Sequence, residues 1–201
     1  MMTLIAAFKA SAEFQALAPS TLRAYSNYIK LIEAEFSDLP LAALDDRRVR
    51  GEFKAWRDRF ANTPRKADYA WTTLARILSF SKDRGLISTN PCEGGGRLYT
   101  ASRTDKIWRD DDVAAFLNSA GREMALALTV ALWTGQRQGD LLRLPWSAFD
   151  GSHIRFKQSK TGRRIIIPAG EPLRVLLDRT ERRSPNGPDQ HAREAVDIGR
   201  I

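Results

Sequence analysis

The stretch WTGQRQGDLLRLPW, residues Trp133–Trp146, is the part of the sequence from which the fold can be argued. The apolar run before it reads as a helix, and Gly135 is a residue that commonly ends one. Arg137 follows directly, so we expect its guanidinium at a surface corner, where it can hold a phosphate with two hydrogen bonds. A merely solvated arginine is the alternative. A short helix is predicted over Gln138–Leu144.

A β-hairpin is predicted after this stretch. The runs HIRFKQ and RRIIIP read as strands, and SKTG joins them with Gly162 at the turn. Lys160 lies in the turn, with Lys157, Arg163 and Arg164 close by. A hairpin tip with four cations can enter a groove of a nucleic-acid duplex, although lysines are common in turns.

The first half of the chain reads as a helical bundle. Apolar residues recur at three- and four-residue steps from Leu22 to Phe36, after a possible cap at Ser20. A second such set runs from Val49 to Phe60. A third begins with Thr63 as cap and Pro64 at the first helical position, and Gly85 ends it. A short opening helix is expected around Leu4–Leu17.

Composition changes divide the chain. The run Ser88–Lys106 is rich in Gly, Pro and polar residues and reads as a linker. Two more helices follow, and the second, REMALALTVALWTG, is apolar enough to be buried. EPLRVLLDRT is a last helix. The predicted organisation is a helical domain over 1–99, a linker over 100–107, a second domain over 108–183 and an aperiodic tail over 184–201.

The balance of charge favours a polyanionic partner. The 201 residues carry 32 Lys and Arg against 24 Asp and Glu, a net charge of +8. The stretch DDRRVRGEFKAWRDRF could hold nucleic acid or be a solvated helix face. The candidate DNA contacts are Arg47, Arg48, Arg50, Lys54, Arg65, Lys66, Arg163 and Arg164.

Other site classes receive little support. A single cysteine, Cys92, excludes an internal disulfide and suits a reducing cytoplasm, and we expect it to be a buried apolar group. His153 and His191 lie far apart, so no metal site and no cofactor are expected. No apolar run reaches the roughly 18 residues of a membrane span. Trp133 and Trp146 are expected to be core anchors rather than base-stacking platforms, and Trp108 is expected to be a packing residue.

The order of these features resembles the tyrosine recombinases, the phage integrase family. TGQRQGDLLRL followed by SKTGRRIIIP matches the family pattern T-G-x-R-x-x-E/D-L and its hairpin lysine, and the likeness covers about residues 10–183. The resemblance implies a mainly α fold. It consists of a helical, SAM-like core-binding bundle before a truncated α+β catalytic domain with a β-hairpin.

The resemblance also implies roles for residues. Arg137 would be the first catalytic arginine, Asp140 the acidic residue that braces it, and Lys160 the hairpin lysine that protonates the leaving 5′-oxygen. In such enzymes a tyrosine attacks a DNA phosphodiester and forms a 3′-phosphotyrosyl link, while arginines stabilise the charge of the transition state. The implied partner is double-stranded DNA, and the mechanism needs no metal.

Two features of the family's catalytic set have no match. The tyrosines Tyr25, Tyr28, Tyr69 and Tyr99 all precede Arg137, whereas the family nucleophile follows the hairpin. The expected H-x-x-R box is not matched by HAREA at His191. A frameshift near Pro185–Gly187 would explain the tail, because a shifted reading permits a family-like continuation.

Three functional readings therefore remain. The chain is expected to be a DNA-binding recombinase remnant that cannot cut alone, whose affinity falls with salt and shows little sequence preference. Alternatively, it is a subunit active in a homo-oligomer or with a full-length recombinase that supplies the missing groups. As a third reading it is a decaying gene product, with apolar surface exposed on MALALTVALW and LRVLL.

Overall fold

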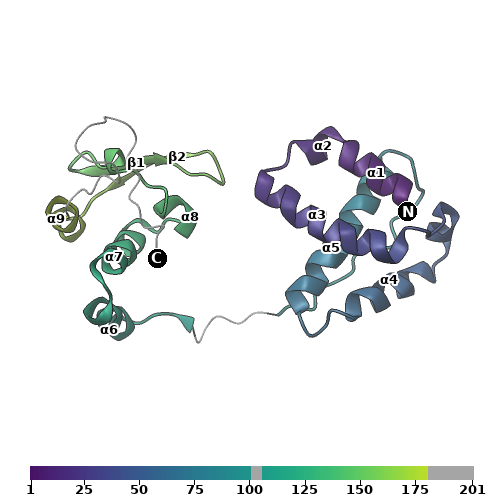
Figure 1. Cartoon of the computed structure of the whole chain (residues 1–201), viewed down its shortest axis with the longest axis horizontal. Helices are drawn as coiled ribbons and strands as arrows, with labels where there is room; N and C mark the ends of the chain where they lie inside the picture. Colours follow the sequence, from purple (N-terminus) through teal and green to yellow (C-terminus); the bar gives the residue numbers. More distant parts are fainter. Residues whose placement is uncertain (101–105, 181–201) are drawn as a thin grey trace. The chain divides into compact units, whose positions relative to one another are not determined.

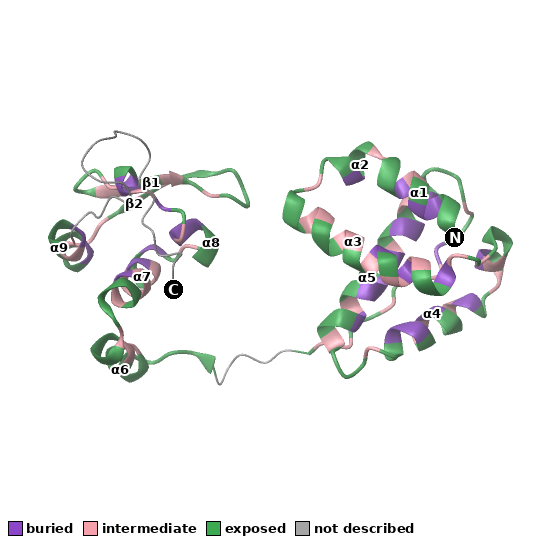
Figure 2. Cartoon of the chain, viewed as in Figure 1, coloured by how far each residue is buried: buried purple, intermediate pink, exposed green. Residues whose placement is uncertain are grey.

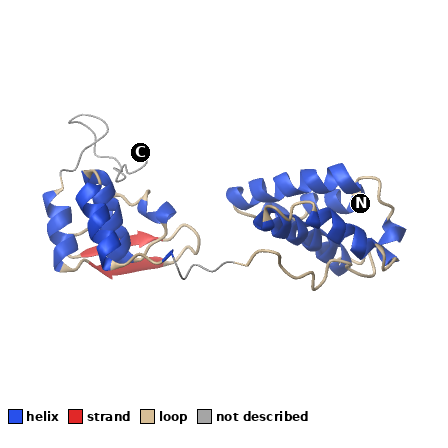
Figure 3. Cartoon of the chain, turned by 90° about the horizontal axis from the view of Figure 1, so that it is seen from below, coloured by secondary structure: helices blue, strands red, loops and turns tan. Residues whose placement is uncertain are grey.

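The computed structural model describes residues 1–100 and 106–180. The chain forms two compact units, Met1–Arg103 and Thr104–Ile201. Helices dominate both units, and the described residues contain one two-stranded antiparallel sheet (Figures 1 and 3). The mainly α fold class with a single β-hairpin is thereby confirmed. The predicted tail over 184–201 lies outside the described residues.

Unit 1 is helical throughout. Two of its helices begin at a proline, which suits the first helical turn because the missing N–H has no partner there. Ser20 is not a cap, since the third helix begins at Pro19 after Ala18. The single opening helix expected over Leu4–Leu17 is divided at Ser11, whose Oγ accepts a hydrogen bond from the Phe14 N–H at 3.1 Å. The elements are α1 (Met2–Ala10), α2 (Ala12–Gln15), α3 (Pro19–Phe36), a short 3-10 helix (Leu41–Asp45), α4 (Val49–Asp58) and α5 (Pro64–Asp83).

The core of unit 1 forms around α5, which packs against α1, α3 and α4. Its residues Leu74, Ile77 and Leu78 are fully buried, and Ile29 and Ile32 of α3 are equally inaccessible. Figure 2 shows buried positions along one side of each of these helices. Burial of each such side chain contributes about 1.5–3 kcal/mol, so the periodic apolar faces account for the bundle.

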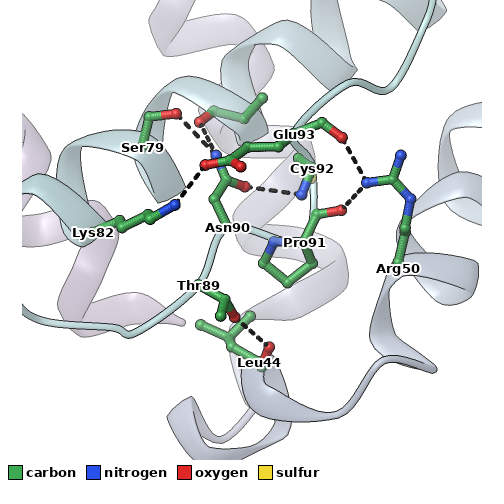
Figure 4. A network of polar contacts seen from close by, with 10 residues as sticks. Leu44, Arg50, Ser79, Lys82, Thr89, Asn90, Pro91, Cys92 and Glu93 are labelled. Atoms are coloured by element: carbon green, nitrogen blue, oxygen red, sulfur yellow. Dashed lines mark hydrogen bonds and ion pairs between the residues drawn. The ribbon is translucent and has the colours of Figure 1, made fainter.

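The chain after α5 packs onto unit 1 at Thr89–Glu93 (Figure 4) and again at Leu98 and Tyr99, whose N–H groups donate to Asp68, so it is not the loose linker predicted from Ser88. Asn90 is buried, and its amide donates to Ala75 O at 3.1 Å and to Ser79 Oγ at 2.8 Å. Its Oδ1 accepts from the N–H of Cys92, which is buried as predicted. Arg50 donates to the carbonyls of Pro91 and Glu93 at 2.5 and 2.7 Å. Side chains therefore satisfy the backbone of this irregular segment.

The glycine triplet in this segment has a packing role. A Cβ at Gly95 would lie 1.9 Å from Nε1 of Trp71, so only glycine fits against the buried indole. Arg57 contacts both residues, with its guanidinium 5.3 Å from the centre of the Trp71 ring and a hydrogen bond donated to Gly95 O at 3.2 Å. This arginine is only 6% exposed and is therefore structural.

Unit 2 places the hairpin after a set of helices. Strand β1 (His153–Lys157) pairs with β2 (Arg164–Pro168), with Arg155 opposite Ile166 and Lys157 opposite Arg164. Gly162 has φ 68° at the turn, as predicted. The helix predicted over Gln138–Leu144 ends three residues earlier. The helices are α6 (Asp110–Ser119), α7 (Arg122–Thr134), α8 (Gln138–Leu141), a short 3-10 helix (Trp146–Ala148) and α9 (Glu171–Arg179).

The core of unit 2 is smaller. Leu126 and Val130 of α7 meet Ile154 of β1 and Leu173 and Leu177 of α9. Trp146 joins this core, as predicted.

Trp133 departs from the prediction that it anchors the core, because it is 45% exposed and lies over Gly170. Trp108 is 52% exposed and packs with its ring 5.4 Å from that of Phe116. The expectation that α7 is buried all round is wrong, because Leu132 is also exposed.

Candidate nucleic-acid interface

The predicted surface corner at Arg137 is formed by the end of α7. Gly135 adopts φ 60° and ψ 21°, and its N–H donates to Ala131 O at 2.8 Å. This left-handed conformation turns the chain out of the helix at little steric cost for glycine. Arg137 then has extended backbone at the N-cap position of α8, and its side chain is exposed.

Lys160 lies at the tip of the hairpin. The loop closes through the Gln158 N–H donating to Arg163 O at 2.8 Å and the Gly162 N–H donating to Gln158 O at 2.9 Å. Thr161 Oγ1 also donates to Gln158 Oε1 at 2.7 Å. Lys160 itself is exposed. The loop is therefore ordered by its own hydrogen bonds and presents the lysine to solvent.

Hydrogen bonds join the corner to the loop. Gln158 Nε2 donates to Gln136 Oε1 at 2.8 Å, and the Ser159 N–H donates to Asp140 Oδ1 at 2.9 Å. Gln136 immediately precedes Arg137, and Ser159 immediately precedes Lys160. The structure thus places the chain segments that carry the two predicted catalytic cations side by side.

Asp140 differs from its predicted role. It was expected to brace the Arg137 guanidinium, but within the described residues no ion pair of 4.0 Å or less joins the two side chains. Asp140 is 6% exposed and holds the hairpin loop instead. Hydrogen bonding to Ser159 lowers the pKa of its carboxyl, and the charges of Arg137 and Arg143 lower it further. Its Oδ2 is buried without a hydrogen-bond partner.

The remaining hairpin cations lie on exposed positions. Arg164 lies opposite Lys157 in the register, and both side chains are exposed. Arg163 is exposed in the loop beside them. The predicted hairpin contacts Arg163 and Arg164 are therefore exposed in the loop and the strand that follow Lys160.

The predicted contacts near α4 fall into different environments. Arg47 is exposed, and Lys54 is half-buried. Arg48 forms an ion pair with Asp46 at 2.7 Å, which leaves its outer face open to solvent. Arg50 is the exception, because its guanidinium is occupied by the backbone carbonyls of the segment that follows α5. The structure thus gives Arg50 an internal role, in place of the predicted DNA contact.

The predicted contacts at the start of α5 are exposed and stacked on aromatic rings. The Arg65 guanidinium lies 4.3 Å from the centre of the Tyr99 ring and donates to its hydroxyl at 2.6 Å. Lys66 Nζ lies 4.5 Å from the centre of the Phe60 ring. Such cation–π contacts hold the charges in place without neutralising them.

Sequence reasoning missed part of this surface. Tyr69 is 59% exposed and stacks on Tyr28 at 5.7 Å, and Thr72 and Arg76 are exposed one and two turns further along α5. Arg65, Tyr69, Thr72 and Arg76 follow one another at steps of four, three and four residues, which places them on one helix face. That spacing was visible in the sequence, on the side of α5 opposite its apolar residues.

Two other kinds of site find no support in the described part of the chain. It contains no group of three or more His, Cys, Asp and Glu side chains that could hold a metal ion. None of its helices is both long and apolar enough to cross a bilayer.

Comparison with known proteins identifies relatives of similar fold. No protein-family model matches the chain. It is 28% identical over 152 residues to the integrase of Escherichia phage HK022, covering 75% of this chain and 42% of that protein. It is 26% identical over 158 residues to the integrase of Escherichia phage lambda, covering 78% and 44%. The chain therefore spans less than half the length of these curated relatives.

Solved structures show the same fold. A lambda integrase (75–356) dimer bound to a COC′ core site superposes with a TM-score of 0.68 at 24% identity, over 84% of this chain and 60% of that chain. A lambda integrase tetramer bound to a Holliday junction gives 0.67 at 24% identity, over 86% and 52%. The curated relatives support assignment of this chain to the tyrosine recombinase family, the family of the phage integrases, and the solved structures show that it shares the fold of lambda integrase.

Proposed function

We propose that the chain binds double-stranded DNA in the manner of a phage-type integrase and that it cannot cut DNA alone. The hydrogen-bonded junction between the Arg137 corner and the Lys160 loop carries this proposal. Two exposed cations on segments held together in this way can contact the oxygens of one phosphodiester. Little conformational entropy is lost on binding, because the hydrogen bonds already order both segments. The integrase relatives and the DNA-bound lambda integrase structures support this choice of ligand.

The helical unit would act as a core-binding domain. Its candidate surface is the exposed face of α5, where Arg65, Tyr69, Thr72 and Arg76 combine charge, an aromatic ring and a hydroxyl. Arg47 and Lys66 add further charge to unit 1. Phosphate contacts from such residues give affinity with little sequence preference.

The distribution of tyrosines supports the absence of cleavage. Tyr25, Tyr28, Tyr69 and Tyr99 all belong to unit 1, and the sequence has no tyrosine after Arg137. The family mechanism needs a tyrosine and a second arginine beside the phosphate held by Arg137 and Lys160. A second candidate function is therefore a subunit whose partner supplies both groups, which the dimeric and tetrameric lambda integrase structures favour. The proposed substrate and the single buried thiol both suit the cytoplasm.

Binding of a short fluorescent duplex, followed by anisotropy over a range of salt, tests the DNA proposal. We expect affinity to fall steeply with salt, and Arg137→Gln and Lys160→Gln each to reduce the slope of log K against log salt by about 1. Arg174→Gln changes an exposed cation on α9 and is the matched control. An unmodified chain that shows no salt-dependent affinity would overturn the proposal.

A suicide DNA substrate tests the absence of cleavage. The chain alone should give no covalent protein–DNA adduct on a denaturing gel. An adduct formed by the purified chain would contradict the binding-only function. An adduct formed only after addition of a full-length integrase whose own Arg137 and Lys160 equivalents are inactivated would favour the second candidate.

A further inference from the structure

A cleft of about 310 Å³ lies in unit 2 beside the hairpin. The segment that follows α8 forms one wall, with Arg143 and Ser147, and β1 forms the other, with Arg155 and Lys157. Ser159 and Asp140 also line it. Its volume is at the lower end of the range of small-molecule pockets, about 300–1,000 Å³, so it can receive a phosphate together with an attached sugar.

Positive charge dominates the cleft. Arg143, Arg155 and Lys157 line it against the single carboxylate of Asp140. Arg155 uses its Nε for Asp150 at 2.9 Å, and this leaves the other guanidinium nitrogens available. Within the described residues, Arg143 and Lys157 take part in no ion pair of 4.0 Å or less.

Local structure directs these cations into the same space. Arg155 and Lys157 are two residues apart on β1, so they lie on one face, while Ile154 enters the core and Phe156, between the two cations, packs against it. Arg143 Nη2 donates to Ser159 Oγ at 3.3 Å, and a Cβ at Gly139 would lie 3.3 Å from the same Nη2. The glycine therefore leaves room for the guanidinium to lie against α8.

The cleft is adjacent to the proposed DNA contact and separate from it. Neither Arg137 nor Lys160 lines it, although Ser159 and Asp140 connect the two places. Asp140 stays charged, because the hydrogen bond from Ser159 and two arginines lower its pKa, but it is one carboxylate against the three cations of Arg143, Arg155 and Lys157. The carboxylate therefore does not cancel the attraction of the cleft for an anion.

We propose that this cleft is a second phosphate-binding site, occupied by a phosphodiester near the one that Arg137 and Lys160 hold. The identity of the phosphate as DNA rests on the proposed function, whereas the affinity of the cleft for phosphate does not. Hydroxyls of Ser147 and Ser159 and the cations of Arg143, Arg155 and Lys157 supply the donors. Unit 2 would then contact the DNA backbone at two phosphates.

The salt dependence of DNA binding tests this site. Lys157→Gln is the cleanest variant, because Lys157 has no ion pair among the described residues and is exposed. We expect Lys157→Gln and Arg143→Gln each to reduce the salt slope by about 1, and the double variant by about 2. Arg174→Gln should leave it unchanged. Thermal melts of each variant check that the fold is retained.

Titration with inorganic phosphate separates the cleft from the DNA proposal. In ¹⁵N-labelled protein the amide signals of Lys157 and Ser159 should shift on addition of phosphate, and Lys157→Gln should weaken the response. A response with an unchanged DNA salt slope would support the phosphate site and identify free phosphate as its source. If neither the slope nor these signals change, the cleft proposal is wrong. If the unmodified chain does not bind DNA, the proposed function is wrong, and the phosphate titration still tests the cleft.

Discussion

The two units differ in how completely they cover their own apolar surface. The core of unit 1 contains 18 buried apolar residues, whereas that of unit 2 contains nine. Eight of the twelve exposed large apolar side chains in the described residues belong to unit 2, and they include Ile107, Leu132 and Trp133. In α6 no residue is buried. Unit 1 therefore has the interior of an independent domain, and unit 2 has a partial one.

The larger core and the predicted catalytic cations therefore lie in different units. The predicted catalytic cations lie in the less covered unit, where hydrogen bonds between Gln136, Asp140 and the hairpin loop hold the site locally. The more covered unit carries the proposed DNA-binding face of α5 over its larger core. We therefore expect the same kind of mutation to have different consequences in the two units.

Truncation of one buried leucine in each unit should have the largest effect. Leu74 and Leu173 are both fully buried, and replacement by alanine costs about 2–5 kcal/mol in a packed core. Leu74→Ala should destabilise unit 1 but leave it folded. Leu173→Ala should unfold unit 2, because its smaller core has less stability to lose.

Cysteine alkylation and hydrogen exchange distinguish the two outcomes. Burial raises the pKa of the Cys92 thiol to about 12, so the thiol should react only when unit 1 opens. Leu74→Ala should accelerate alkylation of Cys92, and Leu173→Ala should not. Hydrogen exchange followed by mass spectrometry should show the loss of protection in α7 and α9 for Leu173→Ala. Simultaneous loss of protection in both units would contradict independent unfolding.

Addition of one methyl group to a glycine should have the next largest effect. A Cβ at Gly95 would lie 1.9 Å from the Trp71 ring, and a Cβ at Gly170 would lie 2.5 Å from the Trp133 ring. Trp71 is only 4% exposed and cannot move aside, so Gly95→Ala should cost about 1–3 kcal/mol. Trp133 is 45% exposed and can rotate into solvent, so Gly170→Ala should cost less.

Chemical denaturation measures this difference. Urea unfolding of unit 1, followed by Cys92 alkylation, should show the lower midpoint for Gly95→Ala. Exchange protection of α9 should report the smaller change for Gly170→Ala. Trp133→Ala combined with Gly170→Ala should remove the remaining penalty at Gly170. Equal losses from the two glycine variants would show that Trp133 is held as firmly as Trp71.

Local signals in the sequence predicted most of the elements. Gly135, Gly162 and Pro64 act on their own chain segment, so the helix end at residue 135, the hairpin turn and the start of α5 agree with expectation. The boundary of α8 was less predictable, since the chain after Leu141 has no strong stop signal before Pro145. Ser20 was misjudged because Pro19 already supplies the helix start.

Contacts between distant segments could not be predicted in this way. Arg50 was a plausible DNA contact until the structure placed the carbonyls of Pro91 and Glu93 beside it. Asp140 was predicted to brace Arg137, which is close to it in sequence. Its Oδ1 instead accepts a hydrogen bond from the N–H of Ser159, which lies 19 residues away. The same limit explains Trp133, whose exposure depends on how much of α7 the hairpin and α9 cover.

Acid should reveal the smallest difference between the units. Hydrogen bonds lower the pKa of Asp140 in unit 2 and of Asp46 in unit 1. A carboxyl with a lowered pKa stabilises the fold above its unfolded pKa, about 3.9, and this contribution disappears as the pH falls through the folded pKa. Asp46 pairs with an arginine two residues away, whereas Asp140 joins α8 to the hairpin loop. Protonation should therefore loosen unit 2 more than unit 1.

Asparagine variants test this expectation. Asp140→Asn can still accept from the Ser159 N–H but has no charge to lose, so the stability of unit 2 should fall less steeply between about pH 5 and pH 2. Asp46→Asn is the matched control in unit 1 and should change the pH dependence of exchange protection in α5 little. Exchange protection of the hairpin loop, compared with that of α5 at each pH, gives the measurement. A hairpin whose protection falls equally steeply in Asp140→Asn would show that the loop depends on other carboxyls, Asp150 first, since its pKa is also lowered by Arg155.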